Sequence, residues 1–246
     1  MSSDTAITKE NLDTYLKELG REYRRLSGKA VPAEIILIGG ASILANYGFR
    51  DMTYDMDAVI VSSSAMKDAI NHVGDKFHLP NGWLNTDFTS TKSFTDKLAE
   101  FSVYYRSYAN ILTVRTVSAE YLIAMKLMAG RKYKNDLSDI VGILWEHQKS
   151  GKPIARDVID NAIIALYGSW NDIPSDSITF IDGVYENGDY ETLYNNSRES
   201  ENESRDALLE FEKKYPDAEV KEENIDAILV KAKKLKAAED KRLRNG

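Results

Sequence analysis

The chain has 246 residues, 43% of them hydrophobic, which is enough for one large core or for a domain of about 150 residues and a smaller one. It has no cysteine, which excludes disulfides, thiolate metal ligands and a cysteine nucleophile. The net charge of −7 argues against a dedicated nucleic-acid-binding module, although basic residues cluster at 131–134 and near the end of the sequence, at 230–246.

The first residues do not resemble a targeting segment. Residues 1–19 are polar and charged, without the apolar stretch of a secretory signal. No apolar run approaches the roughly 18 residues that a membrane-spanning helix needs. We therefore expect a cytoplasmic protein with no membrane partner.

The first 150 residues alternate between the two kinds of apolar periodicity. Leucines and a tyrosine three and four residues apart predict a helix over 8–26, and an apolar, β-branched run predicts a buried strand over 34–38. Residues 78–98 are rich in turn formers and predict a loop. Further predicted elements are a short helix at 41–47, a strand at 55–61, a helix at 65–77 capped by Ser64, strands at 101–105 and 110–117, and helices at 119–129 and 136–147.

Beyond residue 150 the pattern is almost wholly helical. Helices are expected near 154–167, 175–185, 188–213 and 223–243, with prolines between them. The predicted fold class is therefore α/β (α+β), with a small mixed β-sheet flanked by helices in residues 1–150 and a helical C-terminal domain in residues 151–246. The lysine-rich face of residues 230–244 is either solvated or docks an RNA backbone.

Two aspartates stand at the start of a predicted strand. Asp55 and Asp57 are two residues apart, so both side chains project from the same face of the strand. Two such carboxylates form half of a site for a hard cation such as Mg2+. Substrate phosphate and water would supply the other ligands. The alternative is the solvated face of an edge strand.

A glycine pair lies 15 residues before the first of these aspartates. Gly39 and Gly40 follow the buried strand and precede a helix, so backbone N–H groups and the positive end of the helix dipole are available to a phosphate. Ser42 adds a hydroxyl donor. A glycine pair alone is commonly only a turn, but a phosphate site beside metal-binding carboxylates is the arrangement that phosphoryl or nucleotidyl transfer requires.

These motifs resemble those of the DNA polymerase beta superfamily of nucleotidyltransferases. More narrowly, Gly39-Gly40 followed by the Thr-x-Asp-x-Asp of residues 53–57 resembles the branch that contains the AbiEii-like abortive-infection toxins. The later block 120–140 resembles the same branch, with Lys126 on a helix followed by Arg131, Asp136 and Asp139. The similarity covers about residues 33–145.

Lys126 is also unusual on physical grounds. It is the only charged residue between positions 121 and 129, in a helix apolar nearly all round, and a buried ammonium is costly unless it is paired. It either extends along the helix to water or reaches triphosphate oxygens or Asp139. Lys126→Met is therefore expected to keep the fold or to stabilise it slightly. Asp136 opens the next helix, where it either caps the helix or takes part in the site.

The resemblance implies a Mg2+-dependent nucleotidyltransferase that moves an NMP from an NTP to an acceptor hydroxyl. It implies that Gly39, Gly40, Ser42, Lys126 and Arg131 bind the nucleotide, that Asp55 and Asp57 bind metal, and that these two aspartates, Lys126 and Asp139 are catalytic. It also implies RNA (tRNA-like) or protein as acceptor and a cognate antitoxin as partner.

Two questions stay open at the level of sequence. The third carboxylate that many members of the superfamily carry could be Asp87, Glu100 or Asp139. A degenerate nucleotide-binding module on the same fold, or an antitoxin-type interaction protein whose acidic surface pairs with a basic partner, is the alternative to an active enzyme.

Overall fold

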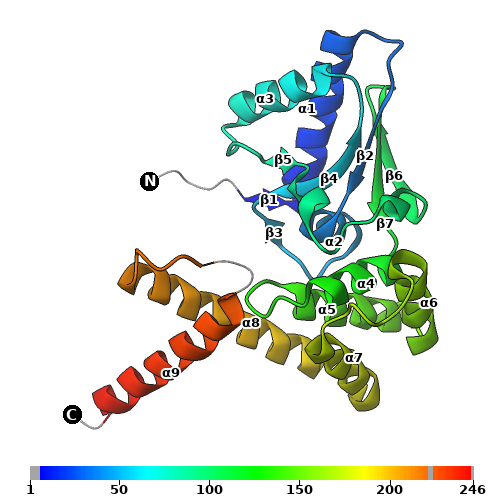
Figure 1. The fold of residues 1–246 in the computed structure, drawn as a ribbon. Coiled ribbons are helices and arrows are strands. Elements are labelled where there is room, and N and C mark those ends of the chain that lie inside the picture. The colour runs from blue at the N-terminus through cyan, green and yellow to red at the C-terminus, as the bar shows by residue number, and fades with distance from the viewer. Residues whose placement is uncertain (1–5, 221–223, 245–246) are drawn as a thin grey trace.

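A five-stranded mixed sheet organises the first half of the chain, in a computed structural model that describes residues 6–220 and 224–244 (Figure 1). The strand order is β5-β4-β2-β7-β6, so β2 lies in the middle, antiparallel to β4 and parallel to β7. The strands of this sheet are β2 (Ala33–Leu37), β4 (Met56–Val61), β5 (Leu84–Asn85), β6 (Ser102–Tyr108) and β7 (Leu112–Val117). A separate two-stranded pair is formed by β1 (Ile7–Thr8) and β3 (Met52–Thr53).

Helices cover both faces of the sheet because its central strand is apolar on both sides. Ile35 and Leu37 of β2 point into one hydrophobic cluster, and Ile36 between them points into the other. The first cluster contains the apolar faces of α1 (Lys9–Ser27) and α3 (Ala65–Phe77), which pack against each other. The second contains those of α4 (Ala119–Ala129) and α5 (Asp136–Lys149).

The described part of the chain beyond residue 150 consists of four helices, the first three of which pack on α4 or α5. These are α6 (Arg156–Tyr167), α7 (Ser175–Asn187), α8 (Tyr190–Lys214) and α9 (Ile225–Arg244). Ile163 and Ile181 belong to the same hydrophobic cluster as α4 and α5, so this core continues across the predicted boundary near residue 150. Helix α8 packs along α5, and α9 packs on α8 and extends away from the sheet (Figure 1).

The predicted fold class is confirmed, and the differences lie in the shortest elements. The helix expected at 41–47 begins earlier, as α2 (Gly39–Asn46), so both glycines belong to its first turn. The predicted loop 78–98 contains β5 and two 3-10 helices, η1 (Asp87–Ser90) and η2 (Asp96–Ala99). Elements of two to four residues are too short to show a periodicity. Ser64 stands at the N-cap of α3, but its side chain makes no capping bond.

The two ends of the chain are described only in part. Residues 1–5, within the polar segment examined for a targeting signal, lie outside the described residues, as do the side chains of residues 235–244 in the lysine-rich helix. Neither interpretation of that helix is therefore tested. Among the described residues, every helix is too short or too polar to cross a membrane.

Candidate active site

A cleft of about 1090 Å³ lies where the end of the sheet, the α4–α5 pair and the C-terminal helices meet. The glycine pair and the acidic side chains Asp55, Asp57 and Asp87 line it from the sheet side. Basic residues of the α4–α5 connection line it from the opposite side. Residues of the C-terminal helices, among them Arg205 and Leu208, close a third side. The predicted phosphate and metal motifs therefore open into one cleft.

The acidic side of the cleft is built by two parallel strands. Asp57 lies in β4 opposite Asn85 of β5, and Asp87 follows two residues later at the start of η1. Burial raises the pKa of the half-buried Asp57, and the neighbouring carboxylate of Asp55 raises it further. Lys134 and Arg131 oppose this increase, and Asp87 adds to it. Negative charge is thus concentrated here without a direct ion-pair partner for Asp57 among the described residues.

The glycine pair is tied directly to the acidic side of the cleft. The backbone N–H of Ile38 donates to the carbonyl oxygen of Asp57 (2.9 Å) and so holds the start of α2 against β4. Gly39 has φ +53°, in the left-handed region, and a Cβ on it would lie 3.9 Å from Oδ2 of Asp57. A Cβ on Gly40 would lie 2.8 Å from both Arg50 Nη2 and Thr53 Oγ1. Glycine is therefore favoured at position 39 by the backbone conformation and at position 40 by the close side chains, before any ligand is considered.

The opposite side rests on a network of buried ion pairs. Nζ of Lys126 lies 2.9 Å from Asp136 Oδ1 and 2.8 Å from Asp139 Oδ2. Arg50 binds Asp139 (2.6 Å), and Nε of Arg131 binds Asp136 (2.8 Å). Burial alone would lower the pKa of Lys126, but the two carboxylates outweigh it and raise that pKa. Burial would likewise raise the pKa of Asp136, but Lys126 and Arg131 hold it well below its ordinary value.

This network decides between two of the alternatives that the sequence left open for Lys126. Because Lys126 also lines the cleft, its predicted contact with triphosphate oxygens stays a prediction. Its ammonium does not reach water along the helix: the side chain is 9% exposed and is bound by two carboxylates, and its predicted contact with Asp139 is confirmed. Asp136 does not cap α5, because Asn135 is the N-cap residue and the Asp136 carboxylate faces Lys126 and Arg131. Asp136 also lines the cleft. Asp139 does not, so its predicted catalytic role stays a prediction.

Two other predicted residues lie away from the cleft lining. Ser42 is fully buried in α2, and its Oγ has no hydrogen-bond partner among the described residues. Its predicted role as a phosphate donor stays a prediction. Glu100, one of the three candidates for a third carboxylate, is exposed at the end of η2 and is not part of the lining. Of those candidates, only Asp87 lines the same cleft as Asp55 and Asp57.

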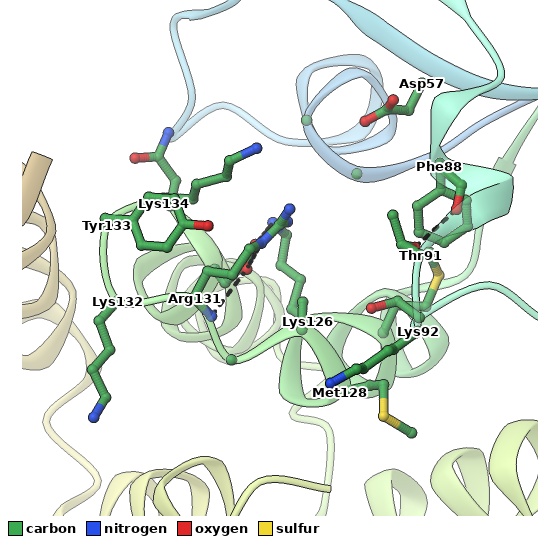
Figure 2. Close-up of a pocket in the computed structure, with 18 of the residues that line it drawn as sticks. Asp57, Phe88, Thr91, Lys92, Lys126, Met128, Arg131, Lys132, Tyr133 and Lys134 are labelled. Carbon is green, nitrogen blue, oxygen red and sulfur yellow. Dashed lines mark hydrogen bonds and ion pairs between the residues drawn. The ribbon is translucent and has the colours of Figure 1, made fainter. Parts of the chain in front are cut away.

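Basic side chains face the aspartates across the cleft. Figure 2 shows Arg131 and Lys134 pointing into the cavity from the α4–α5 connection, with Asp57 on the opposite side. Lys132, which also lines the cleft, points away from Asp57. Arg50 was missed at the level of sequence, because its partner Asp139 lies 89 residues away and no local pattern signals the pairing. Lys92, also in the lining, was missed because it stands in a segment without periodicity.

The acidic side chains fit a divalent cation in one specific way. Within the part of the chain that the structure describes, no group of three or more carboxylates and histidines is placed to hold a metal ion by itself. Mg2+ commonly uses one or two carboxylates and completes its octahedron with water and substrate phosphates. Asp55 and Asp57 supply that number. Burial and, after it, the charge of Asp55 raise the pKa of Asp57, and a bound cation would relieve the repulsion between the two carboxylates.

Comparison with known protein families identifies the class of this domain. Residues 14–146 match the model of a family described as nucleotidyltransferases of unknown function (DUF6036). The match covers more than half of the chain, so the chain belongs to this family. Comparisons with curated proteins and with solved structures found no match. The family supports nucleotidyl transfer in general and leaves the narrower AbiEii-like branch as a prediction.

Proposed function

We propose that this protein is a Mg2+-dependent nucleotidyltransferase that moves an NMP from an NTP to an acceptor hydroxyl and releases pyrophosphate. The observation that carries the proposal is the pair of facing walls in one cleft. Asp55 and Asp57 stand on one side, and Arg131 and Lys134 point in from the other (Figure 2). A metal-bound triphosphate carries both of the charges that such a cleft would complement.

Each wall has a separate task in this proposal. Arg131 and Lys134 bind oxygens of the triphosphate, assisted by backbone N–H groups at Gly39 and Gly40, where the positive end of α2 faces the cleft. Lys126 holds its two aspartates and through Asp136 keeps Arg131 directed into the cleft, since Arg131 and Lys126 share that carboxylate. The cationic wall is thus preorganised before the nucleotide arrives.

The chemical step needs a cation and a proton acceptor. Bound at Asp55 and Asp57, Mg2+ would neutralise charge on the triphosphate and on the departing pyrophosphate. Asp87 accepts the proton of the acceptor hydroxyl while that oxygen forms its bond to the α-phosphorus and the bond to the pyrophosphate oxygen breaks. The position of Asp87 in the cleft supports this assignment, since Glu100 lies outside and Asp139 is bound by Arg50 and Lys126.

The biological setting follows from the narrower resemblance. The Thr-x-Asp-x-Asp of residues 53–57 is similar to that of the AbiEii-like toxins. We therefore propose a cytoplasmic toxin-antitoxin or phage-defence component, with a tRNA-like RNA or a protein side chain as acceptor and a cognate antitoxin as partner.

Label transfer tests the function directly. The protein is incubated with each α-labelled NTP and Mg2+, either alone or with total cellular RNA, and labelled macromolecules are sought. We expect transfer by the wild type and by Asp68→Asn, an exposed control on α3, and about 1000-fold less transfer by Asp57→Asn. If the wild type binds NTP in calorimetry but transfers nothing, the protein is a non-catalytic nucleotide-binding module. If it does not bind NTP at all, the interaction-protein alternative holds.

A further inference from the structure

A buried glutamate from α8 reaches the first turn of α5. Glu201 is 2% exposed, and its Oε1 accepts hydrogen bonds from the backbone N–H groups of Leu137 (2.8 Å) and Ser138 (3.3 Å). Its Oε2 is also buried and has no hydrogen-bond partner among the described residues. A carboxylate in this position is expensive to bury, so its contacts with α5 must offset a substantial desolvation cost.

These contacts replace a cap that α5 lacks. The first N–H groups of a helix have no partner within the helix and are usually satisfied by the side chain of the N-cap residue. That residue is Asn135, which makes no capping bond and whose Oδ1 is buried without a partner. The cap comes instead from Glu201, which lies 64 residues after Leu137 and 63 residues after Ser138, beyond the family segment 14–146.

The turn that Glu201 holds is the one that carries the aspartates of the ion-pair network. Asp136 directly precedes Leu137, and Asp139 directly follows Ser138. Any displacement of this turn therefore moves both carboxylates relative to Lys126, and Asp136 relative to Arg131. The geometry links a helix of the C-terminal region to the cationic wall of the cleft through two backbone hydrogen bonds.

We propose that Glu201 is a positioning residue, which fixes the first turn of α5 so that Asp136 and its cationic partners are aligned for the triphosphate. The inference rests on the proposed nucleotidyl transfer and adds to it a control of nucleotide binding by α8. Burial raises the pKa of Glu201 to about 7, against the hydrogen bonds from Ser138 and Leu137, and the charge of Asp139 adds to the increase.

Two substitutions at Glu201 and one on the adjacent exposed surface test the proposal. Glu201→Leu removes the acceptor, Glu201→Gln keeps one acceptor oxygen, and Glu203→Gln makes the same change at an exposed position of α8. In Glu201→Leu we expect amide hydrogen exchange at Leu137 and Ser138 to be about tenfold faster or more. We also expect the KM for NTP to rise about tenfold, with a smaller change in kcat.

The remaining variants distinguish positioning from general stability. Glu201→Gln should restore most of the nucleotide affinity, and Glu203→Gln should match the wild type. A lower melting temperature with unchanged KM and unchanged local exchange in Glu201→Leu would show a purely structural role and overturn the proposal. If Glu201→Leu does not fold, Glu201→Asp, which withdraws the carboxylate by one methylene, must raise KM; an unchanged KM overturns the proposal equally.

The failure of the proposed function can be recognised separately. If the wild type neither binds nor transfers nucleotide, the transferase assignment fails, and the exchange measurement still decides whether Glu201 orders the first turn of α5. If the wild type is active and the Glu201 variants keep both its KM and its exchange pattern, only the positioning role is wrong.

Discussion

The two sides of the cleft satisfy their charges in different ways. On the α4–α5 side, the buried carboxylates Asp136 and Asp139 are each shared between two cations, and the distances of the Lys126 pairs are 2.8 and 2.9 Å. On the sheet side, Asp57 has carboxylates as near neighbours, its pKa is raised, and none of the ion pairs among the described residues includes it.

This difference separates the residues that maintain the structure from those that would take part in the reaction. A buried, fully paired network is costly to break and maintains one geometry, whereas unrelieved negative charge at a cleft is a place for a cation that comes with the substrate. Substitutions on the two sides should therefore have opposite consequences. Those in the buried ion-pair network of the α4–α5 side should reduce stability, and those of the sheet-side aspartates should reduce activity without harming the fold.

The largest effect is expected from Lys126→Met. The sequence alone suggested a neutral or stabilising change, but the structure reverses that sign, because removal of the ammonium leaves two buried carboxylates undercompensated. The free energy of unfolding should fall by about 3 to 5 kcal/mol, measured by urea denaturation. The double variant Lys126→Met/Asp136→Asn should recover part of the loss. A single variant as stable as the wild type would contradict the proposed role of this network.

Asp57→Asn should have the opposite result, a loss of activity without a loss of stability. We expect nucleotidyl transfer to fall about 1000-fold, or about 4 kcal/mol, because the side chain that would hold the cation loses its charge. The melting temperature should stay the same or rise, since burial and Asp55 already disfavour the charged form of Asp57. Label transfer and thermal melting measure the two quantities. Full activity in this variant would remove Asp57 from the proposed metal site.

The sequence predicted the parts of the site that lie close together along the chain. Asp55, Asp57 and the glycine pair could be found because strand and helix periodicities place them at the ends of adjacent elements. The ion pair of Arg50 with Asp139 joins residues 89 positions apart, and the hydrogen bonds that α5 donates to Glu201 join residues 63 and 64 positions apart. No local pattern encodes such pairings, since they depend on how α5, α8 and the connection between α2 and β3 pack.

The same limit applies to the prediction of the fold. The helices and long strands were predicted within a few residues, because each repeats its apolar pattern several times. The two-residue strand β5 was not, although it brings Asp87 beside Asp57. A strand of two residues is defined by its hydrogen-bonded neighbour rather than by its own composition, so the third carboxylate of the cleft stayed ambiguous.

Glu201→Gln should change how stability depends on pH. The pKa of Glu201 is raised from 4.5 to about 7 in the folded protein, so its carboxyl group binds a proton more tightly when folded. The wild type should therefore lose stability as the pH rises from about 4.5 through 7, by about 3 kcal/mol from this group. The variant lacks this titrating group, so its free energy of unfolding should rise by about 3 kcal/mol relative to that of the wild type between pH 4.5 and pH 8. If the free energy of unfolding differed between variant and wild type by the same amount at both pH values, the expectation would be contradicted.

The smallest effect is expected from Lys134→Gln, on the side of the cleft that faces Asp57. Lys134 is exposed, so solvent and salt screen it, and the KM for NTP should rise only about threefold at low ionic strength and less at high salt. Lys134 also favours the ionised form of Asp57, against the larger effects of burial and Asp55.

Removing that positive charge should have opposite effects on the two ligands, which no general loss of structure would produce. Without nucleotide, Mg2+ should bind slightly more tightly to Lys134→Gln, because one repelling cation is gone from the cleft. With nucleotide, the variant should bind the triphosphate more weakly, because one attracting cation is gone. Calorimetric titrations with Mg2+ alone and with NTP, beside Lys67→Gln as an exposed control on α3, measure both. If both affinities fell together, Lys134 would be supporting the structure of the connection rather than facing the ligands, and the charge complementarity of the two walls would not extend to it.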